Sequence, residues 1–173
     1  MKEATRESLG ERHNALLPEM VTIPEGEFWM GTDRQRLERA GLEWQRRFLL
    51  EIPYHRLYLP PYEIAKYPVT NAQYADFVKA TGHRAPVYWE DNRVPSDKGD
   101  HPVVFVSWDD VMSYCRWLTE RTGRRFLVPS EAEWEKAARG SDGRLFPWGD
   151  DRPTPELCNF DRNVGKTTPV GRY

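Results

Sequence analysis

The stretch TNAQYADFVKATG at residues 70–82 decides the first element of the fold, because it contains a complete set of helix signals. Thr70 and Gln73 have the spacing of a capping box, in which each side chain accepts a hydrogen bond from the backbone N–H of the other residue. The apolar residues recur at helical spacing, at Tyr74, Phe77 and Val78. Gly82 is typical of the residue that ends a helix. The stretch therefore predicts an amphipathic helix.

Two stretches further along the chain repeat this arrangement. Residues 107–123 begin with a serine, carry two aspartates in the first turn, where they favour the positive end of the helix dipole, and end at a glycine. Residues 130–140 begin with a capping box of Ser130 and Glu133 and also end at a glycine. Both stretches are predicted to be helices. The apolar stripe of the first comprises Val111, Tyr114, Cys115 and Leu118.

Short apolar runs typical of strands lie around these helices. Residues 20–31 consist of two such runs on either side of a Pro-Glu-Gly turn, and residues 54–59 alternate in polarity. Residues 33–51 are predicted to be an exposed helix or a long loop. Because helices and strands do not alternate as in βαβ units, the sequence predicts an α+β fold with irregular loops. Further strand candidates are 62–67, 103–106 and 126–128.

The composition fits a single globular domain. The chain has 173 residues, 39% hydrophobic and 30% charged, and its net charge of -2 argues against a protein built mainly to bind nucleic acid. Its 7 Trp, 8 Tyr and 14 Pro are typical of a loop-rich domain held together by aromatic rings. Residues 1–19 are predicted to be a polar leader or linker. No apolar run approaches the ~20 residues of a membrane-spanning helix, and no signal peptide opens the chain, so we expect a cytoplasmic protein.

Few residues have the spacing of a catalytic or metal site. Cys115 and Cys158 fit neither a disulfide framework nor a zinc motif, so two free thiols are expected, although a single bridge between them is compatible with the sequence. His55 and His101 are predicted to be hydrogen-bonded structural residues. The sequence contains no Gly-rich phosphate loop and no nucleophile elbow. No catalytic residue is therefore assigned.

Residues 159–165 form a local pattern that points to a ligand. Oxygen-bearing side chains alternate at Asn159, Asp161 and Asn163, and Gly165 allows the loop to turn. Calcium is bound by about six to eight oxygens from such side chains and from backbone carbonyls. The loop is not an EF-hand, because Val170 stands where a bidentate glutamate would be. An Asx-turn loop without a metal accounts for the same residues, so both interpretations stay open.

Several motifs follow one another in a fixed order: MVTIPEGEFWMG at 20–31, YPVTNAQY at 67–74, HPVV at 101–104, PSEAEWE at 129–135, FPWG at 146–149 and TTPVG at 167–171. This ordered set resembles the sulfatase-modifying-factor family, that of the formylglycine-generating enzymes, over residues 20–173. The resemblance implies a modified C-type-lectin fold, which is an α+β domain with little regular structure. One departure is LVPSE at 127–131, where the family usually has Arg-Leu-Pro-Thr-Glu.

The resemblance also bears on metal binding. Family members often bind structural calcium at the 159–165 loop, where Asn159 and the backbone carbonyl of Phe160 match the first family ligands. Asn163, or alternatively Asp161, would supply the next one. The family's oxidases hold copper(I) through a cysteine pair near the C-terminal end of the domain, and soft thiolates are what copper(I) requires.

This sequence ends at Tyr173, before the family's cysteine pair, and neither Cys115 nor Cys158 matches a catalytic cysteine of the family. We therefore expect neither copper binding nor catalysis from the chain as given. The resemblance further implies a truncated family domain, whose core a missing C-terminal segment or a second chain would complete.

Two functions follow from the resemblance. The first is a noncatalytic module that binds a peptide or protein partner. The second is the N-terminal portion of a copper-dependent formylglycine-generating oxidase that acts on a cysteine in a sulfatase-type peptide. A scaffold appended to another enzyme is a third possibility. For the binding module, we predict an aromatic contact surface, although each of its rings could instead hold loops together: Tyr88, Trp89, Trp108 and Trp148.

Overall fold

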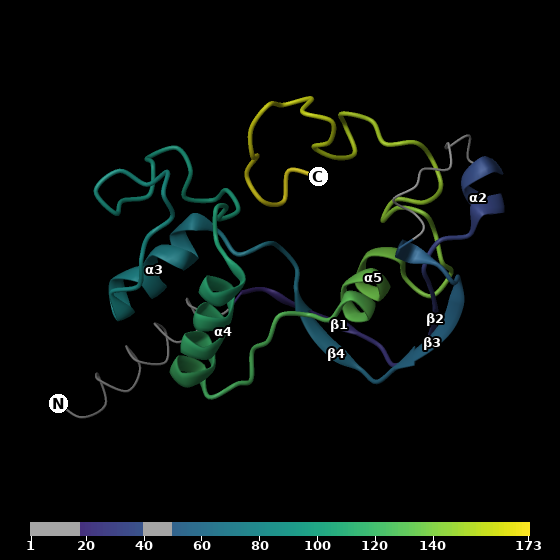
Figure 1. Cartoon of the computed structure of the whole chain (residues 1–173), viewed down its shortest axis with the longest axis horizontal. Helices are drawn as coiled ribbons and strands as arrows, with labels where there is room; N and C mark the ends of the chain where they lie inside the picture. The colour runs from purple at the N-terminus through teal and green to yellow at the C-terminus, as the bar shows by residue number, and fades with distance from the viewer. Residues whose placement is uncertain (1–17, 40–49) are drawn as a thin grey trace. The chain divides into compact units, whose positions relative to one another are not determined.

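The computed structural model describes residues 18–39 and 50–173, which form two compact units (Figure 1). Among these residues, the first unit comprises 18–20, Ala65–Val128 and Arg162–Tyr173, and the second comprises 21–39, 50–64 and Pro129–Asp161. Residues 1–17 of the predicted leader lie outside the described residues. Within the described ranges, no helix is both long and apolar enough to cross a membrane.

The first unit contains the helices α3 (Asn71–Thr81) and α4 (Trp108–Thr122), which contact each other. Both begin with the capping boxes that their sequences carry. At α3, the Thr70 N–H donates to the Gln73 side chain at 3.0 Å, and the Gln73 N–H donates to the Thr70 hydroxyl at 3.3 Å. Both helices end at a glycine in the left-handed region, with φ of 71° at Gly82 and 70° at Gly123. These two predicted helices are confirmed.

Aromatic rings form the core of the first unit. The ring of Tyr74 from α3 stacks on that of Tyr114 from α4 at a centroid distance of 5.7 Å. The Phe77 ring meets the Tyr114 ring edge-on at 5.6 Å. The apolar stripe of α4 is wider than its sequence suggested, because Trp117 is also buried. The buried core cluster consists of Tyr74, Phe77, Ala85, Trp89, Tyr114, Trp117 and Leu118.

A buried amide holds the loops of the first unit against α3. Asn71 is 1% exposed, and its Nδ2 donates to the backbone oxygens of Lys98 at 2.8 Å and His101 at 3.3 Å. Its Oδ1 accepts from the indole N–H of Trp89 at 3.3 Å and from the hydroxyl of Tyr88. One side chain thus satisfies donors from residues 88–89 and acceptors from the turn 98–101.

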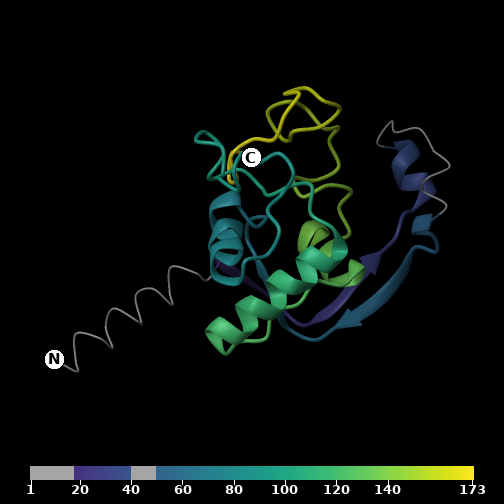
Figure 2. The same ribbon diagram turned by 60° about the vertical axis from the view of Figure 1, so that its left-hand side comes forward.

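The strands form two two-stranded sheets, β1 (Met20–Ile23) with β4 (Tyr62–Ala65), and β2 (Gly26–Met30) with β3 (His55–Leu59). The β2–β3 pair is antiparallel, with Gly26 opposite Leu59 and Met30 opposite His55, and Figure 2 shows it as a curved ribbon. These four strands were expected from the sequence, and the mixture of helices and strands agrees with the α+β class.

The helix α5 (Glu131–Arg139) packs on β2 in the second unit through two buried cations. The Lys136 ammonium donates to the backbone oxygens of Pro24 at 2.8 Å and Gly26 at 2.9 Å. The Arg139 guanidinium donates to the carboxylate of Glu135 and to the backbone oxygen of Gly31. This helix confirms the third predicted helix, but its buried face is charged rather than apolar.

Two strand predictions are wrong. Residues 103–106 do not form a strand, because Phe105 has a left-handed backbone with φ of 56°, which interrupts any extended run. Residues 126–128 do not form one either, since the Phe126 N–H donates to the hydroxyl of Thr119 at 2.9 Å instead of to a neighbouring strand.

The region 33–51 differs in part from its predicted exposure. It contains the short helix α2 (Arg34–Arg39), in which Leu37 is 4% exposed and therefore belongs to a core. Residues 40–49, which include Leu42 and Trp44, lie outside the described residues.

Candidate functional site

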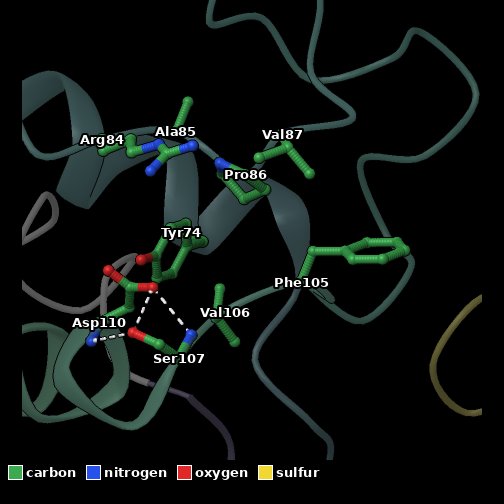
Figure 3. Close-up of a pocket in the computed structure, with 9 residues that line it drawn as sticks. All are labelled: Tyr74, Arg84, Ala85, Pro86, Val87, Phe105, Val106, Ser107 and Asp110. Atoms are coloured by element: carbon green, nitrogen blue, oxygen red, sulfur yellow. Dashed lines mark hydrogen bonds between the residues drawn. The ribbon is translucent and has the colours of Figure 1, made fainter.

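A pocket of about 310 Å³ lies in the first unit, between the loop that follows α3 and the loop that precedes α4 (Figure 3). Residues from both loops meet there with one residue from the middle of α3 and one from the first turn of α4. Its lining consists of Tyr74, Arg84, Ala85, Pro86, Val87, Phe105, Val106, Ser107 and Asp110.

The polar side of this pocket is the capping box of α4. The Asp110 carboxylate accepts from the backbone N–H of Ser107 at 2.8 Å and from its hydroxyl at 2.7 Å. The other carboxylate oxygen lies 2.7 Å from Nε2 of His83. The hydrogen bonds from Ser107, followed by that from His83, lower the pKa of Asp110 to about 2. The pocket therefore contains a fixed carboxylate that is ionised at neutral pH.

The hydroxyl of Tyr74 lies beside this carboxylate without a hydrogen-bond partner. Tyr74 is 2% exposed, and its hydroxyl is the buried side-chain polar atom that no described residue satisfies. Figure 3 shows that its hydroxyl end is turned toward Asp110. Burial, with a contribution from the Asp110 charge, raises the pKa of Tyr74 to about 12. A neutral phenol with an unused donor and unused acceptor sites thus borders the pocket.

The rim of the pocket is apolar and exposed. Val87 is 67% exposed and Phe105 is 73% exposed, and Figure 3 shows the Phe105 ring extending outward from the pocket. Trp108, the first residue of α4, is 65% exposed. Arg84 is also exposed, and its guanidinium makes no ion pair with any residue of the described ranges. An exposed phenylalanine ring in the lining of a pocket is suited to binding a partner.

The four rings predicted to bind a partner do not lie together on one exposed surface in the structure. Trp89 is 6% exposed and belongs to the core, and the Tyr88 hydroxyl is bound to Asn71. Trp148 lies in the second unit, where it stacks on Phe146 at 5.2 Å and donates its indole N–H to a backbone oxygen. Of the four, Trp108 is largely exposed, and the other three hold loops. The contact surface itself stays a prediction.

The predicted calcium ligands are exposed residues on both sides of the boundary between the units. Asn159, Phe160 and Asp161 end the second unit, and Asn163 and Gly165 belong to the first. The backbone turns through left-handed residues, with φ of 47° at Asp161 and 72° at Gly165. Amide, carbonyl and carboxylate oxygens are a donor set that suits a hard cation. The calcium site stays a prediction.

The remaining candidate residues have structural surroundings. His101 is buried, with Nδ1 2.9 Å from the hydroxyl of Thr167, and His55 has Nδ1 2.7 Å from the backbone oxygen of Pro53, as predicted for structural histidines. Neither cysteine forms a disulfide, as expected, and burial raises the pKa of Cys115. Among residues 18–39 and 50–173, no three His, Cys, Asp or Glu residues are grouped so that they could hold a metal ion.

The unsatisfied hydroxyl leads to a prediction about stability. Replacing Tyr74 by phenylalanine removes a buried polar atom that has no partner and keeps the ring, so we expect the free energy of unfolding to rise by about 1 kcal/mol. Thermal unfolding followed by circular dichroism would show a melting temperature about 2–4 °C higher. Tyr114→Phe, in the same core, is the control and should bring no such gain. A less stable Tyr74→Phe variant would contradict the prediction.

The fold and this site define a class: a mixed α and β domain whose irregular loops are held by aromatic rings and carry a small pocket. Residues 5–173 match the sulfatase-modifying factor enzyme 1-like domain. The chain therefore belongs to the sulfatase-modifying-factor family, as its motifs suggested.

Relatives of the chain have diverse descriptions. A formylglycine-generating enzyme of Streptomyces coelicolor is 36% identical over 172 residues, which covers 76% of this chain and 50% of that protein. The uncharacterized protein YfmG of Bacillus subtilis is 31% identical over 147 residues, covering 76% of this chain and 27% of that protein. The structure of PvdO from Pseudomonas aeruginosa has a TM-score of 0.68 at 28% identity, covering 90% of this chain and 63% of PvdO. The chain thus spans about half or less of these two curated relatives.

Proposed function

We propose that this chain is a noncatalytic peptide- or protein-binding module of the sulfatase-modifying-factor family, and that the rim of the pocket is its contact surface. We further propose that its fold is the modified C-type-lectin type that the family resemblance implies. The similarity to PvdO over most of the chain supports a shared architecture with that protein.

The conformation of Phe105 is the observation that carries the binding function. A left-handed backbone costs a non-glycine residue about 1–2 kcal/mol. Phe105 contacts the ring of Tyr88 at a centroid distance of 5.8 Å, but most of its surface, 73%, is exposed. A glycine would make the same turn at no such cost. Residues kept in such a conformation concentrate at functional sites, and exposed aromatic rings are frequent anchors of interfaces. The ring is therefore best explained by a partner that it contacts.

Selection of displayed random peptides tests this function. We expect the chain to enrich peptides that bind Phe105→Gly at least tenfold more weakly than wild type. This factor corresponds to a loss of ~1.4 kcal/mol of binding free energy, as for the removal of one anchor residue. Fluorescence polarisation with the selected peptides provides the measurement. Phe105→Gly relieves the backbone strain, so loss of folding does not confound the result.

The matched control is Trp134→Ala, which removes another largely exposed ring, 64% exposed, from α5 of the second unit. It should leave the affinities unchanged. Peptides that bind wild type and Phe105→Gly equally well would rule out this surface.

The alternative function is that of an oxidase portion, and the 36% identity to the formylglycine-generating enzyme of Streptomyces coelicolor favours it. In the test, the chain is incubated with copper(I), dioxygen and a cysteine-containing sulfatase-type peptide. Mass spectrometry then shows whether an aldehyde-reactive probe has labelled the peptide. An aldehyde in the peptide would favour the oxidase, whereas an unchanged peptide would favour the binding module. We expect no copper to be retained by this chain.

We also propose a structural calcium ion at the 159–165 loop, held by the Asn159 amide oxygen, the Phe160 carbonyl and either Asn163 or Asp161. A bound ion stabilises the folded state by about 2.7 kcal/mol when its concentration is a hundred times its dissociation constant. We therefore expect calcium in the purified protein by elemental mass spectrometry, and a melting temperature that falls when a chelator is added.

The variant Asn159→Ala should abolish the chelator effect, while Asp97→Asn, an exposed carboxylate elsewhere, should preserve it. Purified protein without calcium, together with an unchanged melting temperature in chelator, would exclude this site.

A further inference from the structure

We propose that the pocket receives the side chain of a lysine from the bound peptide, with its ammonium group at Tyr74 and Asp110 and its stem along Val87 and Phe105. This inference rests on the proposed binding function and names the residue type that the site selects.

The polar end of the pocket calls for a hydrogen-bond donor with a positive charge. The Oδ2 atom of Asp110 already accepts two bonds from Ser107, whereas Oδ1 accepts one from His83 and keeps a free acceptor site. The hydroxyl of Ser107 uses its proton on Asp110 (Figure 3), and the oxygen of Tyr74 has no partner. Acceptor atoms therefore predominate around Tyr74 and Asp110, where the carboxylate is negative; the other charged residue of the lining is Arg84. An ammonium group, with three donors, complements this arrangement.

The walls of the pocket fit a slender alkyl stem. Ala85, Pro86, Val87 and Val106 form apolar surface between the exposed rim and the buried hydroxyl of Tyr74. A lysine carries its charge at the end of four methylene groups and commonly lays that stem along apolar surface. The α-amine of a peptide, by contrast, has its own backbone beside it and cannot reach a buried hydroxyl through such walls.

The bonds already made by Asp110 favour lysine over arginine. A guanidinium gains its strength from two parallel bonds to both oxygens of a carboxylate. Ser107 occupies both sites on Oδ2 and His83 one site on Oδ1, so this two-point geometry is obstructed, whereas an ammonium needs a single free site. Arg84 at the mouth adds an exposed positive charge. It favours a peptide carbonyl or an acidic neighbour beside the lysine and disfavours a second cation.

A titration with capped amino acids tests this inference. The full chain, labelled with ¹⁵N, is titrated with Nα-acetyl-lysine N-methylamide and with the corresponding norleucine and arginine compounds. We expect lysine to shift the amide signals of Val106 and Ser107 in a saturable manner, and norleucine and arginine to bind at least ~10-fold more weakly, since a charge-assisted hydrogen bond is lost or misplaced. Tyr74→Phe should weaken lysine binding by a similar factor, and Tyr114→Phe should not.

The outcomes separate this inference from the proposed function. Equal binding of the lysine and norleucine compounds would overturn the lysine site. An unaltered lysine affinity in Tyr74→Phe would also overturn it, and would indicate that the Tyr74 hydroxyl binds only an ordered water. Peptides that still depend on Phe105 would in that case leave the binding function intact. Conversely, amide shifts that only the lysine compound causes would support the lysine site. If the selected peptides then bound wild type and Phe105→Gly equally well, the proposed contact surface at the rim would be refuted.

Discussion

Replacing Arg139 by methionine is expected to lower the free energy of unfolding by about 3–5 kcal/mol, because it removes one partner of a buried ion pair. The side chains of Arg139 and Glu135 are 11% and 15% exposed. The guanidinium also donates to the backbone oxygens of Gly31, Gly143 and Arg144. In the variant, these oxygens would lose this donor, and the Glu135 carboxylate would lose its buried cation while keeping the bond from the Gly31 N–H. Urea unfolding of the full chain measures the change.

Arg144→Met is the matched control, because it removes an arginine a few residues away whose ion pair with Asp142 is exposed to solvent. It should change the stability little. Arg139→Lys keeps the charge but loses the fork that reaches several oxygens, so an intermediate loss is expected. A change below about 1 kcal/mol in Arg139→Met would show that the Arg139 bonds, including that to the Gly31 carbonyl, do not hold α5 to the end of β2.

Replacing Asn71 by alanine is expected to cost about 3–4 kcal/mol, since one substitution leaves several buried groups unsatisfied and opens a cavity. The carbonyls of Lys98 and His101 each lose one of two donors and keep a backbone N–H bond, from His101 and from residue 71 respectively. The Trp89 indole and the Tyr88 hydroxyl lose their acceptor. Chemical denaturation gives the loss, and the indole N–H signal of Trp89 reports the same bond locally.

The comparison within α3 is Gln73→Ala, which removes one capping bond at the partly exposed helix start and is expected to cost about 1 kcal/mol. Asn71→Asp tests the donors separately, because a carboxylate would face the carbonyl of Lys98 at the position of the present Nδ2. It should be at least as destabilising as alanine. Equal effects of Asn71→Ala and Gln73→Ala would show that the amide network contributes little.

The helices were predictable because their determinants are local. A capping box needs two residues three positions apart, and a glycine in the sequence marks the C-terminal end of α3 and of α4. The false strand at 103–106 has the opposite origin. Its apolar residues have the composition of a strand, but the backbone at Phe105 turns, and no sequence pattern announces a phenylalanine with positive φ.

The burial of two cations on α5 could not be predicted from the pattern of polar and apolar residues in its sequence. Lys136 and Arg139 are 4% and 9% exposed, although such residues are rarely buried unless they are paired. Their partners, Pro24, Gly26 and Gly31, lie more than a hundred positions earlier in the chain. Pairing over that separation is set by the fold.

The candidate pocket was missed for a related reason. Tyr74 was assigned to the apolar stripe of α3, and Asp110 to the favourable dipole of α4, and both assignments are correct for most of each side chain. What they leave out is that the two polar ends meet beside the 84–87 loop. Nothing in the sequence marks a tyrosine whose hydroxyl lacks a partner, because that depends on every neighbour at once.

The ammonium of Lys136 binds main-chain carbonyls, which every amino acid provides, rather than a particular side chain. The position of the turn between β1 and β2 consequently depends on its backbone conformation and not on the identity of its side chains. Glu25 should accept wide replacement, including by residues grafted to carry a label or an epitope, whereas position 26 should remain glycine, since its φ of 133° is open to few other residues.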